Sequence, residues 1–420
     1  MPSAAPVLAV SPTAVPAMAG WSRLRQWAVI YGCGTLLGLL AADVVQGGFN
    51  TGLVPLKPIL FSLASAALCL GLSLVSRPRI CLPALALLIL PVWRALDAEV
   101  LQRFELTDIS QFAMTVTRTL LLVIAMIAVL STSEGLRAAS VAAVVAILAT
   151  SGSVIAEALG WIHLTPIPGR YCGFSGHPNA PPMILCEMLG LLFMLKSSFR
   201  FNLIMLLICV PGVALTYGRG GMVLLAFMGA GYVALNARRH PLTLLLSVAL
   251  AIPLIGAGFT LLQSGSRQGL LEDKNISDRL DAIYSLDFEK LKSPERIKDL
   301  SDAWEAVRHQ PLLGQGVGAS GGYWAPHNEL ISIWLELGLG GLLVFLALHA
   351  ALILRVLHQR GRGGFALLAI IAFIPLAQGR IDTVHYWLTL TTLVHTLWPR
   401  RYRLAWQAPT PTAPPRRPSA

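Results

Sequence analysis

A histidine beside a glycine-rich run is the residue of this sequence best suited to proton transfer. His327 follows a segment that contains Gly314, Gly316 and Gly318, and it precedes a long apolar stretch. An imidazole has an ordinary pKa of about 6.5, so it can accept a proton near neutral pH. The position therefore predicts a general base. A helix-capping or interfacial histidine without chemistry is the alternative.

Arg219 has the surroundings of an anion-binding residue. It interrupts an apolar hairpin within the sequence TYGRGG, where neighbouring glycines leave room for a large group to approach the backbone. Arginine suits phosphate because its planar guanidinium donates two parallel hydrogen bonds. We therefore expect Arg219 to bind a phosphate group. The alternative is an arginine that extends to the membrane interface.

The elements that position these residues are predicted to be membrane-spanning helices. Of the 420 residues, 55% are hydrophobic and 13% are charged, whereas soluble domains carry about 25% charge. About 20 apolar residues cross a bilayer as a helix. Twelve stretches fit this length, at 26–46, 54–75, 79–96, 111–131, 137–160, 181–198, 202–217, 220–236, 241–263, 328–357 with a break, 364–378 and 383–398. The expected fold is an all-α polytopic membrane protein.

Basic residues predict the orientation of these helices, because cytoplasmic loops retain Lys and Arg. Every second connection is basic, and the acidic connection at 97–108 and the long segment 265–326 lie on the other side. We therefore expect both ends of the chain in the cytoplasm. The net charge of +11 is explained by contact with anionic membrane lipids and does not imply nucleic acid. The basic connections are marked by Arg23 and Arg25, Arg77 and Arg79, Arg137, Lys196 and Arg200, Arg238 and Arg239, Arg355, Arg360 and Arg362, and Arg400, Arg401 and Arg403.

The segment 265–326 holds a third of the charged residues and is predicted to be a small helical domain facing water. Apolar residues at helical spacing indicate an amphipathic helix that ends before Pro311. The expected organisation is a cytoplasmic tail at 1–20, helices 1–9 at 21–264, this loop domain at 265–326, helices 10–12 at 327–400 and a second tail at 401–420. The apolar face comprises Ile297, Leu300, Ala303, Trp304 and Val307.

The junction from 311 to 341 resembles the O-antigen ligases, a superfamily of bacterial ligases and polymerases. The signature of this superfamily is P-x-x-G-x-G, then H-N-x-x-L, then a pair of glycines. The matching residues are Pro311, Gly314, Gly316, His327, Asn328, Leu330, Gly338 and Gly341. Two other segments agree with the resemblance, the turn TYGRGG and the loop RYCGFSGHPNA at 170–180.

The resemblance implies further site residues. Arg296 stands fifteen residues before Pro311, where the family has a second arginine facing pyrophosphate, and Arg279 is a rival for this role. Arg170, Asn179 and Asn328 are implied to line the substrate site, and His177 belongs to the same loop as Arg170. Asp382 matches an acidic position of the family, although an ion pair with the nearby Arg380 is equally expected.

The function implied by the resemblance is transfer of a lipid-linked glycan. An O-antigen ligase moves O-antigen polysaccharide from undecaprenyl pyrophosphate to the lipid A-core oligosaccharide, on the periplasmic face of the bacterial inner membrane. The implied roles are His327 as base and arginines as pyrophosphate ligands. No cofactor is expected, and acids and histidines do not cluster at metal-ligand spacing.

Two other functions remain open at this point. An O-antigen polymerase or a protein O-oligosaccharyltransferase of the same superfamily would share the loop and the histidine. A lipid-linked oligosaccharide transporter would explain twelve helices without catalysis, but such transporters tend to have internal repeats and substrate groups at the bilayer midplane. In this chain the distinctive residues gather outside the membrane and no repeat is apparent.

Two charged residues are predicted inside the membrane at equal depth. Arg118 and Glu187 lie seven and six residues inside helices that run inward from the outer face, about 10 Å deep at 1.5 Å per residue. A lone charge there is costly, so we expect an Arg118–Glu187 ion pair. The alternative is that Arg118 binds the donor phosphate.

Overall fold

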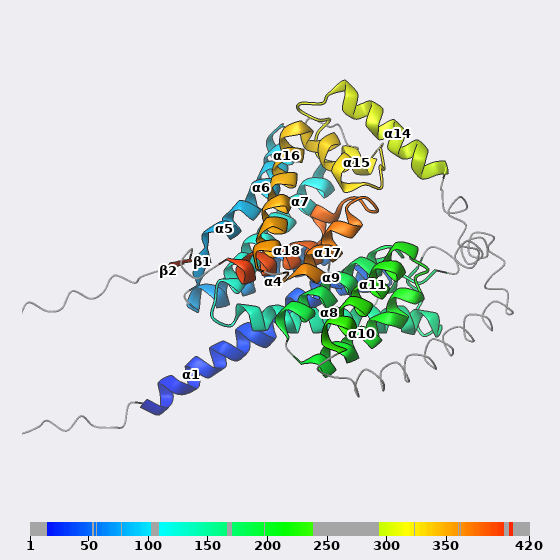
Figure 1. Cartoon of the computed structure of the whole chain (residues 1–420). Coiled ribbons are helices and arrows are strands. Elements are labelled where there is room, and N and C mark those ends of the chain that lie inside the picture. Colours follow the sequence, from blue (N-terminus) through cyan, green and yellow to red (C-terminus); the bar gives the residue numbers. More distant parts are fainter. Residues whose placement is uncertain are drawn as a thin grey trace, which may run out of the picture.

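The computed structural model is helical apart from two three-residue strands (Figure 1). It describes residues 15–52, 54–55, 57–76, 78–101, 109–165, 170–196, 198–237, 294–322, 324–359, 361, 363–398 and 403–405. The strands β1 (Arg79–Cys81) and β2 (Arg403–Ala405) pair antiparallel. The predicted all-helical class is therefore confirmed for the described part of the chain, with this small addition.

The first part of the chain, up to residue 158, forms the helices α1 to α8, of which α1 projects away from the bundle (Figure 1). A π-helical stretch at Ala28–Cys33 joins α1 to α2, so α1 begins within the segment expected to be a tail. The helices are α1 (Val15–Trp27), α2 (Gly34–Ala41), α3 (Val44–Asn50), α4 (Pro58–Val75), α5 (Leu82–Leu85), α6 (Ile89–Leu96), α7 (Ile109–Leu130) and α8 (Gly135–Ala158).

The second half adds further bundle helices and the helix α14 (Pro294–His309), which lies across the top of the molecule (Figure 1). The expected amphipathic helix is thus confirmed, and it ends before Pro311. The remaining helices are α9 (Ala180–Leu195), α10 (Phe199–Ala214), α11 (Arg219–Ala237), α15 (Ala319–Gly322), α16 (Glu329–His358), α17 (Gly364–Phe373) and α18 (Val384–Leu397).

Five helices among the described residues are long and apolar enough to cross a membrane. They are Trp21–Ala41, Pro58–Val75, Ala113–Leu130, Gly135–Ala158 and Glu329–His358, and the shorter apolar helices include α9, α10 and α17. Every stretch predicted to cross the membrane before residue 237, or from residue 328 onward, contains at least one helix. The predicted span 241–263 lies outside the described residues.

Small residues allow the central helices to pack closely. Gly34 and Gly38 of α2 face the backbone of α8, where an added Cβ would lie 2.8 Å from the Ala138 oxygen and 2.7 Å from the Ala142 oxygen. Membrane helices commonly approach through such small residues. This contact places the ends of α2, α3 and α8 together, and α3 in turn packs against the short 3₁₀ turn Gly173–Ser175.

The glycine-rich loop before α16 packs into a break in that helix. Gly338 has a φ of 69° within α16, at the break expected from the sequence. The Leu339 amide and the Trp334 indole both donate to the Pro311 carbonyl, at 2.9 and 2.8 Å. A Cβ on Gly338 would lie 2.1 Å from the Leu312 oxygen. The signature glycines therefore join the loop to α16.

Several connections meet at one end of the bundle, called here the histidine end. Glu329 beside His327 accepts hydrogen bonds from the 380–381 backbone, and the 170–179 loop bonds to the α10–α11 turn through Arg170. Val317 before α15 bonds to Asp97 after α6. Connections marked by Lys196 and Gly363 line a common pocket at the opposite end. The connections expected to share a side of the membrane therefore lie together.

We predict that Gly338→Ala destabilises the protein. The added methyl group would clash with the Leu312 carbonyl, and the positive φ disfavours any Cβ, so the cost should exceed about 2 kcal/mol. Thermal unfolding in detergent measures the change. Gly152→Ala in α8 is the control, because a methyl group added there would meet nothing within 4 Å. Equal melting temperatures for both variants would contradict the packing argument.

Candidate functional site

His327 stands at the histidine end in an unusual backbone conformation. Its φ is 47°, in the left-handed region that non-glycine residues rarely occupy. Its amide donates to the Gln378 side-chain oxygen at 2.7 Å. The next residue, Asn328, directly precedes α16, and its side chain accepts the Leu330 and Ile331 amides, at 3.0 and 3.3 Å. Asn328 thus acts as a helix cap, a role for which its residue type is well suited.

The loop between α17 and α18 fixes the other side of His327. The Gln378 amide nitrogen donates to the Ser320 carbonyl at 3.4 Å, so both ends of this side chain are engaged. The Glu329 amide donates to the Ile374 carbonyl at 2.9 Å. The buried Glu329 carboxylate accepts the Arg380 and Ile381 amides, both at 3.1 Å. These bonds offset the strain of the His327 backbone.

The imidazole of His327 faces the helix α14. Its Nε2 lies 3.8 Å from Asp299 Oδ2, and both side chains are partly exposed. Partial burial and the nearby Arg296 guanidinium lower the pKa of His327, while Asp299 raises it in part. The ring is therefore neutral at neutral pH, the form that accepts a proton. Arg296 and His327 are thus brought together as predicted.

The 170–179 loop adds a second histidine and an arginine to this end. Arg170 donates from Nε to the Thr216 carbonyl and from a terminal nitrogen to Asn179 Oδ1, both at 3.0 Å. His177 Nδ1 accepts the Asn179 amide at 3.2 Å, which places the proton of the neutral ring on Nε2. Partial burial, Arg170, His327 and Arg296 all lower the pKa of His177. The two histidines and two arginines therefore share one electrostatic environment.

One buried carboxylate shapes this loop. Glu157, near the end of α8, accepts four backbone amides, from Leu164 and Thr165 on one oxygen and from Cys172 and Gly173 on the other. Charge-assisted bonds of this kind are stronger than neutral ones. Glu157 therefore holds the loop in the shape that presents Arg170 and His177.

Arg219 begins α11 directly after the turn that Arg170 contacts. Tyr217 in this turn has a φ of 53°, and the Gly218 amide donates to the Thr216 hydroxyl at 3.2 Å. Gly221 packs on Pro182 at the start of α9, where a Cβ would lie 2.3 Å away. The tight turn places the half-buried Arg219 at the histidine end, beside the loop of Arg170.

A buried ion-pair network lies behind the glycine-rich loop. Arg94 of α6 pairs with both Glu336 of α16 and Asp382, at 3.0 Å for Glu336. Glu336 also accepts the Ser320 hydroxyl at 2.6 Å and the Gly318 amide at 3.3 Å. The expected ion pair of Asp382 with Arg380 is wrong, because Arg94 takes the carboxylate of Asp382.

The expected Arg118–Glu187 ion pair is also wrong. Glu187 is fully buried, pairs with Arg380 and lies 2.9 Å from His385 Nδ1. The physical reason is that both oxygens of Glu187 are already engaged, one by Arg380 just before α18 and the other by His385 in α18. Arg118 instead shares an electrostatic cluster with Asp43 and His385. Equal depth alone does not make two helices neighbours.

Arg279, the rival of Arg296, lies outside the described residues. In the described part of the chain, no group of three or more His, Cys, Asp or Glu side chains is arranged to hold a metal ion. The six cysteines all lie in that part, where they are buried and form no disulfide.

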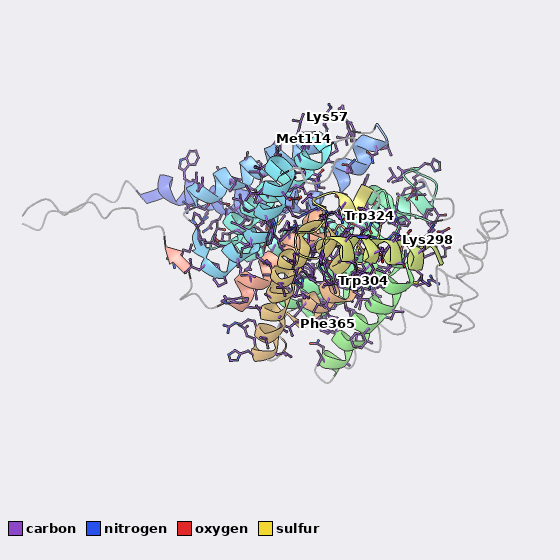
Figure 2. All side chains as sticks on the ribbon, turned by 90° about the horizontal axis from the view of Figure 1, so that it is seen from above. Lys57, Met114, Lys298, Trp304, Trp324 and Phe365 are labelled. Atoms are coloured by element: carbon purple, nitrogen blue, oxygen red, sulfur yellow. The ribbon has the colours of Figure 1, made fainter. Side chains whose placement is uncertain are left out.

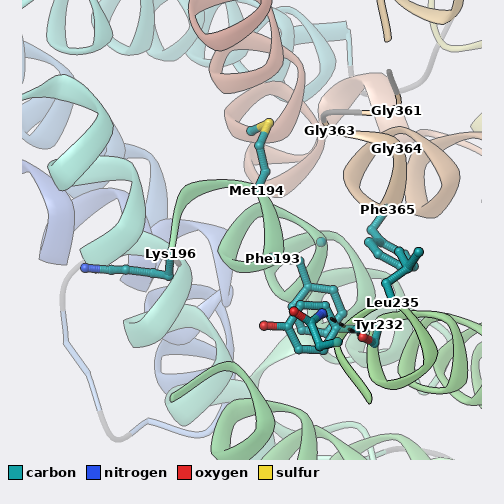
Figure 3. A pocket seen from close by; sticks show the side chains of 11 residues that line it. Phe193, Met194, Lys196, Tyr232, Leu235, Gly361, Gly363, Gly364 and Phe365 are labelled. Carbon is teal, nitrogen blue, oxygen red and sulfur yellow. Dashed lines mark hydrogen bonds between the residues drawn. The ribbon is translucent and has the colours of Figure 1, made fainter. Parts of the chain in front are cut away.

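A pocket of about 280 Å³ lies at the end of the bundle opposite His327. Its wall consists of the stacked rings of Phe193 and Tyr232 with Phe365 at their edge, and glycines at 361–364 form its rim (Figure 3). The side chain of Lys196 points away from these rings (Figure 3). The lining has no acid or imidazole, so we place the chemistry at the histidine end.

Comparison with known families agrees with the geometry. Residues 204–346 match the family described as O-antigen ligase, a range that includes Arg219, Arg296 and His327. This match over part of the chain supports the O-antigen ligase superfamily. A search among curated proteins found no significant match.

The residues that the sequence did not reveal are those that hold the candidate site in place. Asp299, Gln378 and Arg94 contact residues far away in the chain, whereas Glu157 bonds to the loop that follows its own helix. For Asp299 a signal exists in the sequence, because it stands one helical turn after Arg296 and so shares a face of α14 with it. For Gln378 and Arg94, the pairing depends on tertiary neighbours that no local pattern specifies.

We predict that Arg380→Met strongly destabilises the protein, because it leaves Glu187 charged and without its guanidinium partner. Removal of one member of a buried pair costs about 3–5 kcal/mol. The double variant Arg380→Met with Glu187→Gln should recover part of this loss. Melting temperatures in detergent provide the measurement.

Arg118→Met is the matched control, and we expect a smaller loss that Glu187→Gln does not rescue. Strictly additive losses at Arg380 and Glu187, or rescue at Arg118 instead, would contradict the pairing that the structure contains.

Proposed function

We propose that this protein is an O-antigen ligase of the bacterial inner membrane. It transfers O-antigen polysaccharide from undecaprenyl pyrophosphate to a sugar of the lipid A-core oligosaccharide, at the periplasmic face. Twelve transmembrane helices, both termini in the cytoplasm and a periplasmic segment at 265–326 complete the proposal. The alternation of basic and non-basic connections supports this orientation, since the non-basic ones meet at the histidine end.

The observation that carries the proposal is the convergence of one base and several arginines on one end of a membrane bundle. His327 and Arg296 lie within electrostatic reach of each other, and Arg170 and His177 share this environment. Arg219 starts the helix after the turn that Arg170 contacts. A glycan donor with a pyrophosphate leaving group needs such a cationic site beside a base.

The proposed reaction is a direct transfer. His327 removes the proton of the acceptor hydroxyl, whose oxygen then bonds to the anomeric carbon of the donor. The bond from that carbon to the pyrophosphate oxygen breaks, and its electron pair leaves with undecaprenyl pyrophosphate. Arg219 and Arg296, with Arg279 as the rival of Arg296, bind the leaving group and stabilise its developing charge.

Donor binding would strengthen the base. The Arg296 charge lowers the pKa of His327 in the free protein. A pyrophosphate on Arg296 compensates this charge, so the pKa of His327 rises and its affinity for the acceptor proton increases. The arrangement therefore links base strength to the presence of the donor.

We assign the remaining candidates to the boundary of the site. Arg170 and Asn179 bond to each other and are placed beside the donor by their loop. Asn328 and Asp382 contribute indirectly, because a helix cap and an ion pair with Arg94 engage their side chains. Arg118 is a third candidate for phosphate binding, since Glu187 is engaged by Arg380.

We predict that His327→Ala yields an inserted but nearly inactive protein, with a rate lowered roughly 10²- to 10⁴-fold, as for loss of a general base. The test is expression in a strain that lacks its own ligase, with capped lipopolysaccharide as the readout. Wild-type chain should restore capping and His327→Ala should not. His309→Ala, an exposed histidine at the end of α14, is the control and should restore capping.

The wild-type chain could instead fail to restore capping but restore polymer length or protein glycosylation in matching strains. That result would identify the protein as a polymerase or a protein O-oligosaccharyltransferase, respectively. Normal capping by His327→Ala would reject the base. The activity of the wild-type protein should also decline at acidic pH, below the ordinary histidine pKa of about 6.5. The lowered pKa of His327 keeps its ring neutral down to that pH.

We predict that lysine cannot replace the pyrophosphate arginines, although it preserves the charge. A lysine ammonium lacks the planar fork that binds two phosphate oxygens. Arg219→Lys and Arg296→Lys should each weaken binding of the lipid-linked donor, measured with purified protein, by about tenfold or more. Arg308→Lys, exposed on the same helix α14, is the control. Unchanged donor binding in both variants would reject the assignment, and a loss in Arg279→Lys instead of Arg296→Lys would move the second role to Arg279.

A further inference from the structure

Asp299 is the acidic side chain that faces the imidazole of His327. It stands on α14 one helical turn after Arg296, and its Oδ2 lies 3.8 Å from His327 Nε2. Seen from above, α14 crosses the middle of the bundle, with Lys298 and Trp304 on it (Figure 2). The helix therefore brings a cation for the donor and a carboxylate for the histidine to the same place.

The two ring nitrogens of His327 have different surroundings. Nε2 is directed at Asp299. Among the described residues, no hydrogen bond to Nδ1 is found. The backbone of His327 is held separately, by the bond of its amide to Gln378 and by the start of α16. The backbone that carries the ring is thus held in place, a carboxylate lies near Nε2, and Nδ1 has no hydrogen-bond partner among the described residues.

We infer that Asp299 is a positioning residue that accepts a hydrogen bond from Nε2–H of His327 and leaves Nδ1 as the atom that removes the acceptor proton. This inference rests on the proposed function and adds the identity of the reacting nitrogen and of its partner. A carboxylate that orients an imidazole in this way selects one tautomer and stabilises the imidazolium that forms.

The proton balance of the step is simple. The acceptor hydroxyl loses its proton to the Nδ1 lone pair, while the Nε2 proton stays on the ring. His327 then carries one positive charge, which the negative charge of Asp299 offsets. After glycosyl transfer, Nδ1 releases the proton to water and the neutral ring is restored.

The distance of 3.8 Å between His327 Nε2 and Asp299 Oδ2 requires a closing movement of α14. A hydrogen bond from nitrogen to oxygen spans about 2.7–3.2 Å, so the carboxylate must approach by about 1 Å. The far half of α14 is packed on α16 through Ala306 and Val307, whereas its first turn is exposed. The turn that carries Arg296 and Asp299 is therefore the part best able to move, and a pyrophosphate bound to Arg296 would draw it inward.

The charged groups around His327 set the sign of the pH effect. Arg296 and Asp299 face it from α14, and His177, which itself lies near Arg170, interacts with it from the 170–179 loop. Arg296 lowers the pKa of His327 and Asp299 raises it. Loss of the Asp299 charge therefore lowers the pKa of His327. The pH below which activity is lost should fall with it.

The test compares Asp299→Asn with Asp302→Asn, an exposed acid on the same helix. Both variants remove one negative charge from α14, so long-range effects are matched. In purified protein with lipid-linked donor, we expect Asp299→Asn to lower kcat by roughly 10²-fold, the scale of a misplaced catalytic group, with little change in donor KM. We also expect its acidic limb to shift to lower pH, and Asp302→Asn to behave as wild type.

Asp299→Glu provides a conservative variant that should regain part of kcat. Wild-type kcat with an unshifted pH profile in Asp299→Asn would overturn the inference, as would a loss equal to that of Asp302→Asn. A loss that appears only as a lower melting temperature would also overturn it. Activity retained in His327→Ala would instead remove the proposed base itself, so the two failures are distinguishable.

Discussion

Buried carboxylates hold the histidine end of the molecule together. Glu157, Glu329 and Glu336 project from helices that pack in the bundle, and each accepts hydrogen bonds from the backbone or side chains of a connecting segment. A carboxylate away from water is costly unless several donors satisfy it. The helices can therefore bury these acids only when the loops adopt the shapes that supply the donors. The geometry of His327, Arg170 and the glycine-rich loop depends on that requirement.

The same requirement explains why the backbone around His327 is tightly held, whereas the first turn of α14, which carries Arg296, is less restrained. The His327 backbone is fixed by Gln378 and by Glu329, which in turn binds the 380–381 backbone. Arg296 lies on the exposed first turn of α14, away from these carboxylates. Under the proposed function, precise placement of the base and adaptable contact with a large lipid-linked glycan would thus fall to different elements. The break in α16 at Gly338 connects these two elements, because the loop that follows α14 packs against it.

The sequence was sufficient to locate the described helices and to name candidate site residues, but it did not indicate the residues that hold those candidates in place. Apolar length located the described helices, and the glycine and histidine signature located His327, since both are local properties of the chain. The predicted ion pair of Arg118 with Glu187 was wrong because it was inferred from equal depth in the membrane. Depth does not reveal that α9 lies against α17 and α18. Arg94 with Asp382 and Gln378 with His327 are joined across 288 and 51 residues, so no periodicity could indicate them.

The Glu187–Arg380 pair has a consequence for biogenesis. The two residues are 193 positions apart, with α9 synthesised early and the arginine placed just before the last helix. During translation Glu187 of α9 therefore has no Arg380 to pair with until the intervening helices have been made. A nascent chain that ends before Arg380 would retain a buried acid without the guanidinium that pairs with it in the complete protein. The native surroundings of Glu187 can therefore form only after the last helices have been made.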